Sequence, residues 1–174
     1  MTIDSTKEWD RHLPEVQQTL INLKSEKTMH TEKWDRRFLE LAKLVANWSH
    51  DPSTKCGAVI VRADRTIASL GYNGLSRKTP DNLEFYQNRE EKYSRIIHAE
   101  MNAVLALQER AVDYTLYTWP LLCCERCAVH MIQAGITRVV APEASEDALK
   151  RWQTSLLNSL KYFREAGVAT TIIK

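Results

Sequence analysis

The chain has 174 residues, 44% of them hydrophobic and 26% charged, which is typical of one globular domain with a substantial core. Because 24 Lys and Arg residues stand against 22 Asp and Glu residues, the net charge is only +2. This charge does not predict binding to duplex nucleic acid, but it leaves small anionic ligands open. The start of the chain does not read as a secretory signal, and no run of about 18 apolar residues occurs, so we expect a cytoplasmic protein without a membrane span.

The first 32 residues are predicted to form a helical extension, followed by a main domain over residues 33–174. Leu13, Val16, Leu20 and Leu23 are three or four positions apart, which places them on one face of an amphipathic helix. That face could pack on its own chain or contact another subunit, and the pattern does not distinguish the two.

The main domain is predicted to begin with a helix and a β-hairpin. Apolar residues recur at helical spacing over residues 34–45, and the Asp51-Pro52 pair ends this helix. Short runs rich in apolar and β-branched residues predict strands over 57–62 and 66–70, with a tight turn between them.

A turn and a long loop are predicted next. The sequence G-Y-N-G at 71–74 favours a turn, because Gly and Asn tolerate positive φ angles. The polar segment 75–93 predicts a long ordered loop with one helical stretch. Beyond it, strands and helices alternate: a helix over 98–107, a strand over 115–118, a helix over 125–134, a strand over 138–141, a helix over 146–165 and a strand over 168–173. Together with the hairpin, this alternation predicts a three-layer α/β/α sandwich with a mixed, largely parallel five-stranded sheet.

Three of the four cysteines, Cys123, Cys124 and Cys127, are concentrated in the stretch W-P-L-L-C-C-E-R-C-A-V-H. Cys124 and Cys127 lie at the start of a predicted helix, where free backbone N–H groups favour thiolates and both sulfurs can reach one metal ion. In a reduced compartment, C-x-x-C indicates metal or redox chemistry, and Zn²⁺ suits a pair of thiolates.

His98 offers a third ligand, because it also opens a helix that follows a β-unit. Two cysteines and one histidine would leave one zinc position open for water, which is typical of catalytic zinc. Glu100 would then handle protons beside that water. The alternatives are a redox pair, and a binding module without enzymatic activity in which Cys56 or Cys123 supplies a fourth zinc ligand.

The combination of H-x-E on one βα unit and C-x-x-C at the start of the next is the signature of the zinc nucleobase deaminases. From about Lys33 onward the chain resembles the cytidine/deoxycytidylate deaminase superfamily, and most closely the dCMP deaminases. The segments that carry the resemblance are D-P-S-T-K-C-G-A-V-I-V (51–61), G-Y-N-G (71–74), K-Y…H-A-E-M-N-A (92–103), T-L-Y-T (115–118) and C-E-R-C-A…Q-A-G-I (124–136). The resemblance implies a cytidine deaminase-like fold and hydrolysis of dCMP to dUMP with release of ammonia.

The resemblance also implies roles for individual residues. It assigns one Zn²⁺ per chain to three ligands, His98, Cys124 and Cys127, and the proton shuttle to Glu100. It implies nucleotide contacts from three further positions, Asn73, Asn102 and the backbone N–H of Ala99. A 5′-phosphate needs hydrogen-bond donors, and the residue types suggest these candidates: Ser53, Thr54, Lys55, Arg77, Lys78, Lys92 and Tyr93. Residues 75–97 contain neither Cys nor His, so the second, structural zinc of many dCMP deaminases is not expected.

Two features depart from the dCMP deaminase pattern. Cys123 stands where the family has a proline before its first cysteine ligand, and the loop from Thr118 to Cys124 is one residue longer. Because that loop lies beside the base pocket in the family, the alternative substrates are dCTP, a modified dCMP or a purine. The resemblance further implies a homo-oligomer, a hexamer or a dimer, with dCTP and dTTP as regulators.

Overall fold

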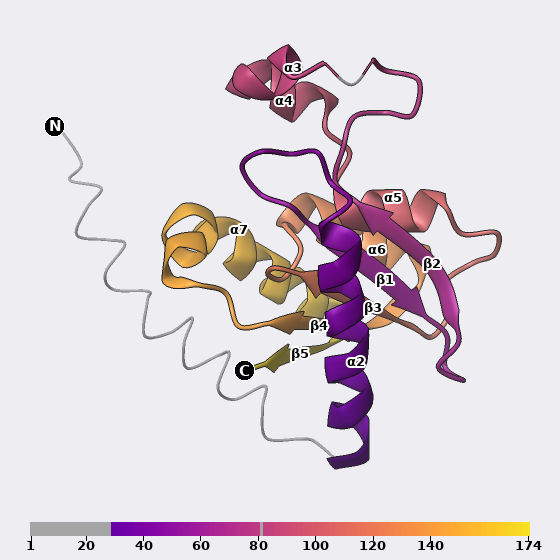
Figure 1. The fold of residues 1–174 in the computed structure, drawn as a ribbon. Coiled ribbons are helices and arrows are strands. Elements are labelled where there is room, and N and C mark those ends of the chain that lie inside the picture. The colour runs from indigo at the N-terminus through magenta and orange to yellow at the C-terminus, as the bar shows by residue number, and fades with distance from the viewer. Residues whose placement is uncertain (1–28, 81) are drawn as a thin grey trace, which may run out of the picture.

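The structure, a computed structural model, describes residues 29–80 and 82–174 (Figure 1). The predicted helix over Leu13–Leu23 lies outside the described residues. Helix α2 begins at Met29 and therefore crosses the boundary that we expected between residues 32 and 33. No helix in the described ranges is long and apolar enough to cross a membrane.

One mixed sheet forms the centre of the described chain. The elements occur in this order: α2 (Met29–Ala46), β1 (Gly57–Val61), β2 (Ile67–Tyr72), α3 (Glu84–Gln87), α4 (Arg89–Arg95), α5 (Ala99–Leu105), β3 (Tyr114–Trp119), α6 (Glu125–Ala134), β4 (Ile136–Pro142), α7 (Glu146–Glu165) and β5 (Ala169–Ile173). The strand order is β2-β1-β3-β4-β5. β1 runs antiparallel to both of its neighbours, whereas β3, β4 and β5 are mutually parallel. The mixed five-stranded sheet is confirmed, but it is not largely parallel, because the hairpin lies antiparallel to β3 as well.

Two apolar layers lie on opposite sides of the sheet, since alternate residues of each strand point to opposite faces. Val59 and Tyr117 face α2 and pack against its Phe38. Ile60 and Leu116 point to the other side, into a core shared with α5, α6 and α7. Figure 1 shows α2 in front of the sheet and these three helices behind it. The predicted three-layer α/β/α sandwich is thus confirmed.

A buried polar network fastens α2 to the sheet. Two nitrogens of the Arg138 guanidinium on β4 each donate to the Asp35 carboxylate at 2.7 Å, and the Tyr117 hydroxyl donates to it at 2.9 Å. Burial, followed by the charge of Asp35, raises the pKa of Tyr117 above its usual value. Asp35 itself is fully buried, so its negative charge depends on these two partners.

The predicted turn at 71–74 is wrong in its first half, because Gly71 and Tyr72 belong to β2. Neither Gly71 nor Asn73 is among the described residues with a positive φ angle. Glycine is needed at position 71 for close packing: a Cβ there would lie 2.2 Å from the carbonyl oxygen of Ala99 and 2.3 Å from the backbone nitrogen of Ala103. This contact brings α5 close to the sheet.

The segment after β2 leaves the sheet and returns to it, at the top of Figure 1. It contains two short helices, α3 and α4, where we predicted one helical stretch. Asn88 caps α4 by accepting the backbone N–H groups of Glu90 and Glu91. A β-bridge between Gly74 and Ile97 joins the two ends of the segment, and the chain then enters α5.

Helices α6 and α7 have the bounds that the sequence predicted. Gly135 ends α6 in a left-handed conformation with φ 100°. Ser145 caps α7 through its hydroxyl, which accepts the backbone N–H of Ala148. The cysteine pair consequently lies at the first turn of α6.

Candidate active site

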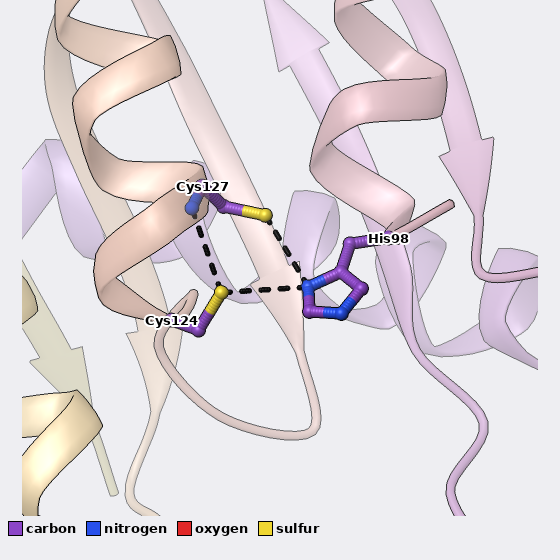
Figure 2. A group of neighbouring side chains, drawn as sticks. All are labelled: His98, Cys124 and Cys127. Atoms are coloured by element: carbon purple, nitrogen blue, oxygen red, sulfur yellow. Dashed lines mark hydrogen bonds between the residues drawn. The ribbon is translucent and has the colours of Figure 1, made fainter. Parts of the chain in front are cut away.

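His98, Cys124 and Cys127 are brought together by the starts of two helices, as Figure 2 shows. His98 is the N-cap of α5, and Cys124 is the N-cap of α6, one turn before Cys127. The two helices contact each other on the same side of the sheet. The Nδ1 atom of His98 lies 3.4 Å from each of the two sulfurs.

These three ligand atoms suit zinc. They all lie within 4.8 Å of one another and form the single group of this kind in residues 29–80 and 82–174. A zinc ion with bonds of about 2.3 Å to sulfur and about 2.1 Å to nitrogen holds the two atoms about 3.6 Å apart at a tetrahedral angle. The observed 3.4 Å is close to that spacing, and two cysteines with one histidine are a donor set that zinc favours.

Among the described residues, no further cysteine joins this group. The Sγ atom of Cys123 instead lies 3.8 Å from the hydroxyl of Ser159 in the core. Cys56 lies apart from the group too, and burial, followed by the charge of Glu100, raises the pKa of its thiol. A structural zinc module closed by Cys56 or Cys123 is therefore not supported, and one coordination position is left for a water or substrate.

The two cysteine ligands differ in acidity. The hydrogen bond from Cys127, together with His98, lowers the pKa of Cys124 to about 4, whereas the pKa of Cys127 is raised because its thiol is the donor. The backbone N–H of Cys127 also points to the Cys124 sulfur, at 3.5 Å. Cys124 is therefore the ligand of the pair that more readily forms the thiolate that zinc binds.

Glu100 lies in the first turn of α5, two residues after His98, and is only 7% exposed. Burial raises the pKa of its carboxyl above the usual range, and His98 acts in the opposite direction. Its side chain lines the same cavity as His98 and Cys124. A buried carboxyl beside a candidate metal ligand is suited to exchanging protons with a bound molecule.

A cavity of about 500 Å³ opens onto these residues. Its walls come from the loop after α2, from α3 and α4, from the loop between β3 and α6, and from α7. Four aromatic side chains contribute to them, Tyr86, Tyr93, Trp119 and Trp152. The volume falls within the range of about 300–1,000 Å³ that is usual for sites of small molecules and cofactors.

Asp51 organises one wall of this cavity. Its carboxylate accepts the backbone N–H groups of Ser53 and Thr54, at 2.8 and 3.2 Å. It also accepts the Asn73 amide at 3.2 Å and the Lys92 ammonium at 2.7 Å. Lys92 donates in addition to the Ser53 hydroxyl at 3.1 Å. The network therefore joins α4 to the loops that follow α2 and β2.

Asn73 uses most of its hydrogen-bonding capacity within this wall. Its Oδ1 atom accepts the backbone N–H of Cys56 at 2.7 Å, and its Nδ2 atom donates to the Thr54 carbonyl at 2.9 Å as well as to Asp51. Both amide hydrogens are used, so a second lone pair on Oδ1 is the capacity that remains for a ligand.

The metal centre has a counterpart among known proteins. Residues 32–143 match the family described as "Cytidine and deoxycytidylate deaminase zinc-binding region". The match covers more than half of the chain and includes Glu100 and all three candidate metal ligands. The chain belongs to this deaminase family. It is accordingly a zinc-dependent hydrolase of the deaminase type, with His98, Cys124 and Cys127 as the candidate zinc site.

Individual relatives of the deaminase are similar over most of its length. An Aliivibrio fischeri protein described as "Uncharacterized deaminase in luxG 3'region" is 40% identical over 141 residues, which are 80% of this chain and 92% of that protein. A Caenorhabditis elegans protein described as "Probable deoxycytidylate deaminase" is 33% identical over 146 residues, 79% of this chain and 73% of that one. The crystal structure of dCMP deaminase from the cyanophage S-TIM5 in complex with dCMP and dUMP covers 85% of this chain and 100% of its own, with a TM-score of 0.63 at 17% identity. That last similarity supports the cytidine deaminase-like fold.

The predicted nucleotide contacts divide into two groups. Ser53, Thr54 and Asn73 line the cavity of the deaminase. Asn102 does not; its Nδ2 atom donates to the carbonyl oxygen of Tyr72 at 2.7 Å and ties α5 to β2. The Ala99 side chain is fully buried against the sheet, so only its backbone could meet a ligand.

The phosphate candidates also divide, and the cavity adds residues that the motifs did not indicate. Lys92 and Tyr93 line it, whereas Lys55, Arg77 and Lys78 do not. The additional wall residues include Arg89, Trp119, Arg151 and Trp152. The last two lie on α7, outside every motif, and the helical pattern of α7 shows only which of its faces is buried. No sequence signal indicated that this face borders the metal centre.

Proposed function

We propose that this deaminase hydrolyses dCMP to dUMP and ammonia. The observation that carries the proposal is the three-ligand metal centre with an open position and buried Glu100 beside it, at the wall of a nucleotide-sized cavity. The Caenorhabditis elegans relative described as a probable deoxycytidylate deaminase supports the same substrate.

The chemistry depends on a water activated at the metal centre. His98, Cys124 and Cys127 would hold a zinc ion, which when bound would lower the pKa of water and so supply a nucleophile at neutral pH. Glu100 accepts a proton from the attacking water and delivers it to N3 of the cytosine ring, which makes C4 electrophilic. After the water oxygen has added to C4, Glu100 takes the remaining proton of that oxygen and passes it to the amino group. The C4–N bond then breaks, ammonia leaves, and the C4 carbonyl of the uracil base forms.

Fixed polar groups orient the substrate in this proposal. The backbone N–H of Ala99 donates to the carbonyl oxygen of the base. Asn73 accepts a sugar hydroxyl through the lone pair that remains on its Oδ1 atom. Ser53 and Thr54 position the nucleotide from the loop after α2, whereas Asn102 acts indirectly by holding α5 against β2.

The proposal is tested by zinc content and by ammonia release from dCMP, dCTP, deoxycytidine and AMP. The wild type should bind one zinc per chain and prefer dCMP. Glu100→Ala should keep the zinc and lose activity by a factor of about 10² to 10⁴. Glu91→Ala is the matched control, because Glu91 is a half-exposed carboxylate on α4 whose ion pair among the described residues is with Arg95. Full activity of Glu100→Ala would refute the mechanism, and a preference for dCTP or AMP would refute the substrate.

We further propose that the deaminase forms a homo-oligomer, a hexamer or a dimer, with residues 1–32 as an extension of the deaminase domain and dCTP and dTTP as regulators. Large apolar side chains exposed on and near α5 and α6, Leu105, Val112 and Val129, support a subunit contact. Light scattering of the full chain, with and without dCTP or dTTP, measures the assembly; a monomer at all concentrations would contradict it.

A further inference from the structure

Among the residues that the structure describes, three Lys and Arg side chains line the substrate cavity, and two of them already have partners. The Lys92 ammonium is buried and paired with Asp51 at 2.7 Å. Arg89 donates from Nε to the Tyr93 hydroxyl at 3.2 Å, and its guanidinium lies over the Tyr93 ring at 5.3 Å. Both charges are therefore engaged with the wall of the cavity.

Arg151 is the third cation, and its guanidinium is free. Within residues 29–80 and 82–174, no carboxylate pairs with it and no hydrogen bond holds it. Arg151 is exposed on α7, and Trp152 and Ser155 from the same helix also line the cavity. Positions 151 and 155 are one helical turn apart, so this face of α7 borders the cavity for more than a turn.

The same face of α7 is attached to the metal centre. The Ser155 hydroxyl donates to the carboxylate of Glu125, and Glu125 lies between the ligands Cys124 and Cys127 in the sequence. α7 also packs directly against α6, which carries both of these ligands. Arg151 is consequently held on a rigid element with a fixed position relative to the reacting end of the cavity.

We propose that Arg151 binds the 5′-phosphate of the nucleotide and thereby makes the enzyme select nucleotides over nucleosides. The inference rests on the proposed function, since it places the cytosine at Glu100 and the phosphate at the α7 side of the cavity. A guanidinium without a competing carboxylate can offer a phosphate two parallel hydrogen bonds. Arg151 thus takes the role for which the sequence suggested Lys92, whose charge is already neutralised by Asp51.

The test compares kcat/KM for dCMP and for deoxycytidine in four variants: Arg151→Ala, Arg151→Lys, Lys150→Ala and Arg89→Ala. Arg151→Ala should lower the value for dCMP by about 10- to 100-fold and change that for deoxycytidine less than about twofold. Arg151→Lys should retain part of the preference, because an ammonium keeps the charge but loses the fork. Lys150→Ala is the matched control: Lys150 is the neighbouring exposed cation on α7, lies outside the cavity lining, and should leave both values unchanged.

The outcomes separate this inference from the proposed function. If the wild type deaminates dCMP and Arg151→Ala retains the full preference for dCMP over deoxycytidine, the inference is overturned while the function stands. A loss of preference in Arg89→Ala but not in Arg151→Ala would also overturn it. If the wild type deaminates neither compound, the function fails and the inference fails with it. A fluorescence titration with dUMP and deoxyuridine, using Trp119 and Trp152 as reporters, checks phosphate recognition without turnover.

Discussion

Asp51 and Lys92 form one ion pair, yet replacing them should have unequal effects on stability. Their side chains are 3% and 10% exposed, so the pair is buried on the wall of the cavity. Without Lys92, the Asp51 carboxylate still accepts the backbone N–H groups of Ser53 and Thr54 and the amide of Asn73. Without Asp51, the Lys92 ammonium keeps the Ser53 hydroxyl as its one hydrogen-bond partner among the described residues. The lysine is therefore the charge that a single substitution leaves without compensation.

The expected costs follow from this difference. Asp51→Ala strands a buried charge and should lower the free energy of unfolding by about 3–5 kcal/mol. Lys92→Met keeps most of the side-chain volume and should cost about 1–2 kcal/mol. For a chain of this size, about 1 kcal/mol shifts the unfolding temperature by about 2–4 °C, which gives decreases of about 6–20 °C and about 2–8 °C.

Thermal and urea unfolding of zinc-saturated protein measure these values. Glu91→Ala, at an exposed surface pair on the same helix, is the control and should cost less than about 1 kcal/mol. The double variant Asp51→Ala/Lys92→Met should be more stable than Asp51→Ala alone, because the uncompensated charge is gone. Costs that simply add in the double variant, or a larger cost for Lys92→Met than for Asp51→Ala, would refute the reasoning.

Three further predictions concern the metal centre and the core. Cys124→Ser should lose zinc, whereas Cys123→Ser should keep it, because Cys123 lies outside the ligand group; zinc loss in Cys123→Ser would show that the ligands have been assigned wrongly. Gly71→Ala should lower the free energy of unfolding by about 1–3 kcal/mol and weaken zinc binding, since the new Cβ would meet the backbone of α5. Gly74→Ala is the control and should be tolerated, because its Cβ would lie 3.9 Å from the nearest described atom. Because the pKa of Tyr117 is raised in the folded state, the unfolded chain loses the hydroxyl proton first as pH rises above about 10, and the free energy of unfolding falls there. In Tyr117→Phe, the free energy of unfolding measured by urea should decrease less steeply with pH above this value. Equal slopes in the wild type and the variant would contradict the assignment.

The fold and the metal ligands could be predicted because both depend on local patterns. The start of α6 is encoded by its cysteine N-cap and its end by Gly135, so Cys124 and Cys127 were placed correctly. His98 could be identified because it opens the preceding helix on the same side of the sheet. A consistent signal at each level of the sequence explains why these predictions held.

The cavity wall could not be predicted in the same way. We predicted a turn at Gly71, but this glycine is needed for close contact with α5, a helix that begins 28 positions later. The spacing of residues along the chain does not indicate such a contact. Lys92 was a candidate for binding the phosphate because its partner Asp51, 41 positions away, could not be inferred from the sequence. No motif indicated Arg151, since only the packing of α7 beside the metal centre brings it to the substrate cavity.

The division of the zinc ligands between two helices links metal binding to folding. An unfolded chain retains Cys124 and Cys127 as a local chelating pair, but His98 is 26 positions from the first of them and joins only when α5 and α6 are in contact. The native chain therefore binds zinc more tightly than the unfolded one, and by mass action the ion stabilises the native state. A chelator should consequently act on this enzyme as a denaturant, and occupancy of the site becomes a measure of how much of the chain is folded.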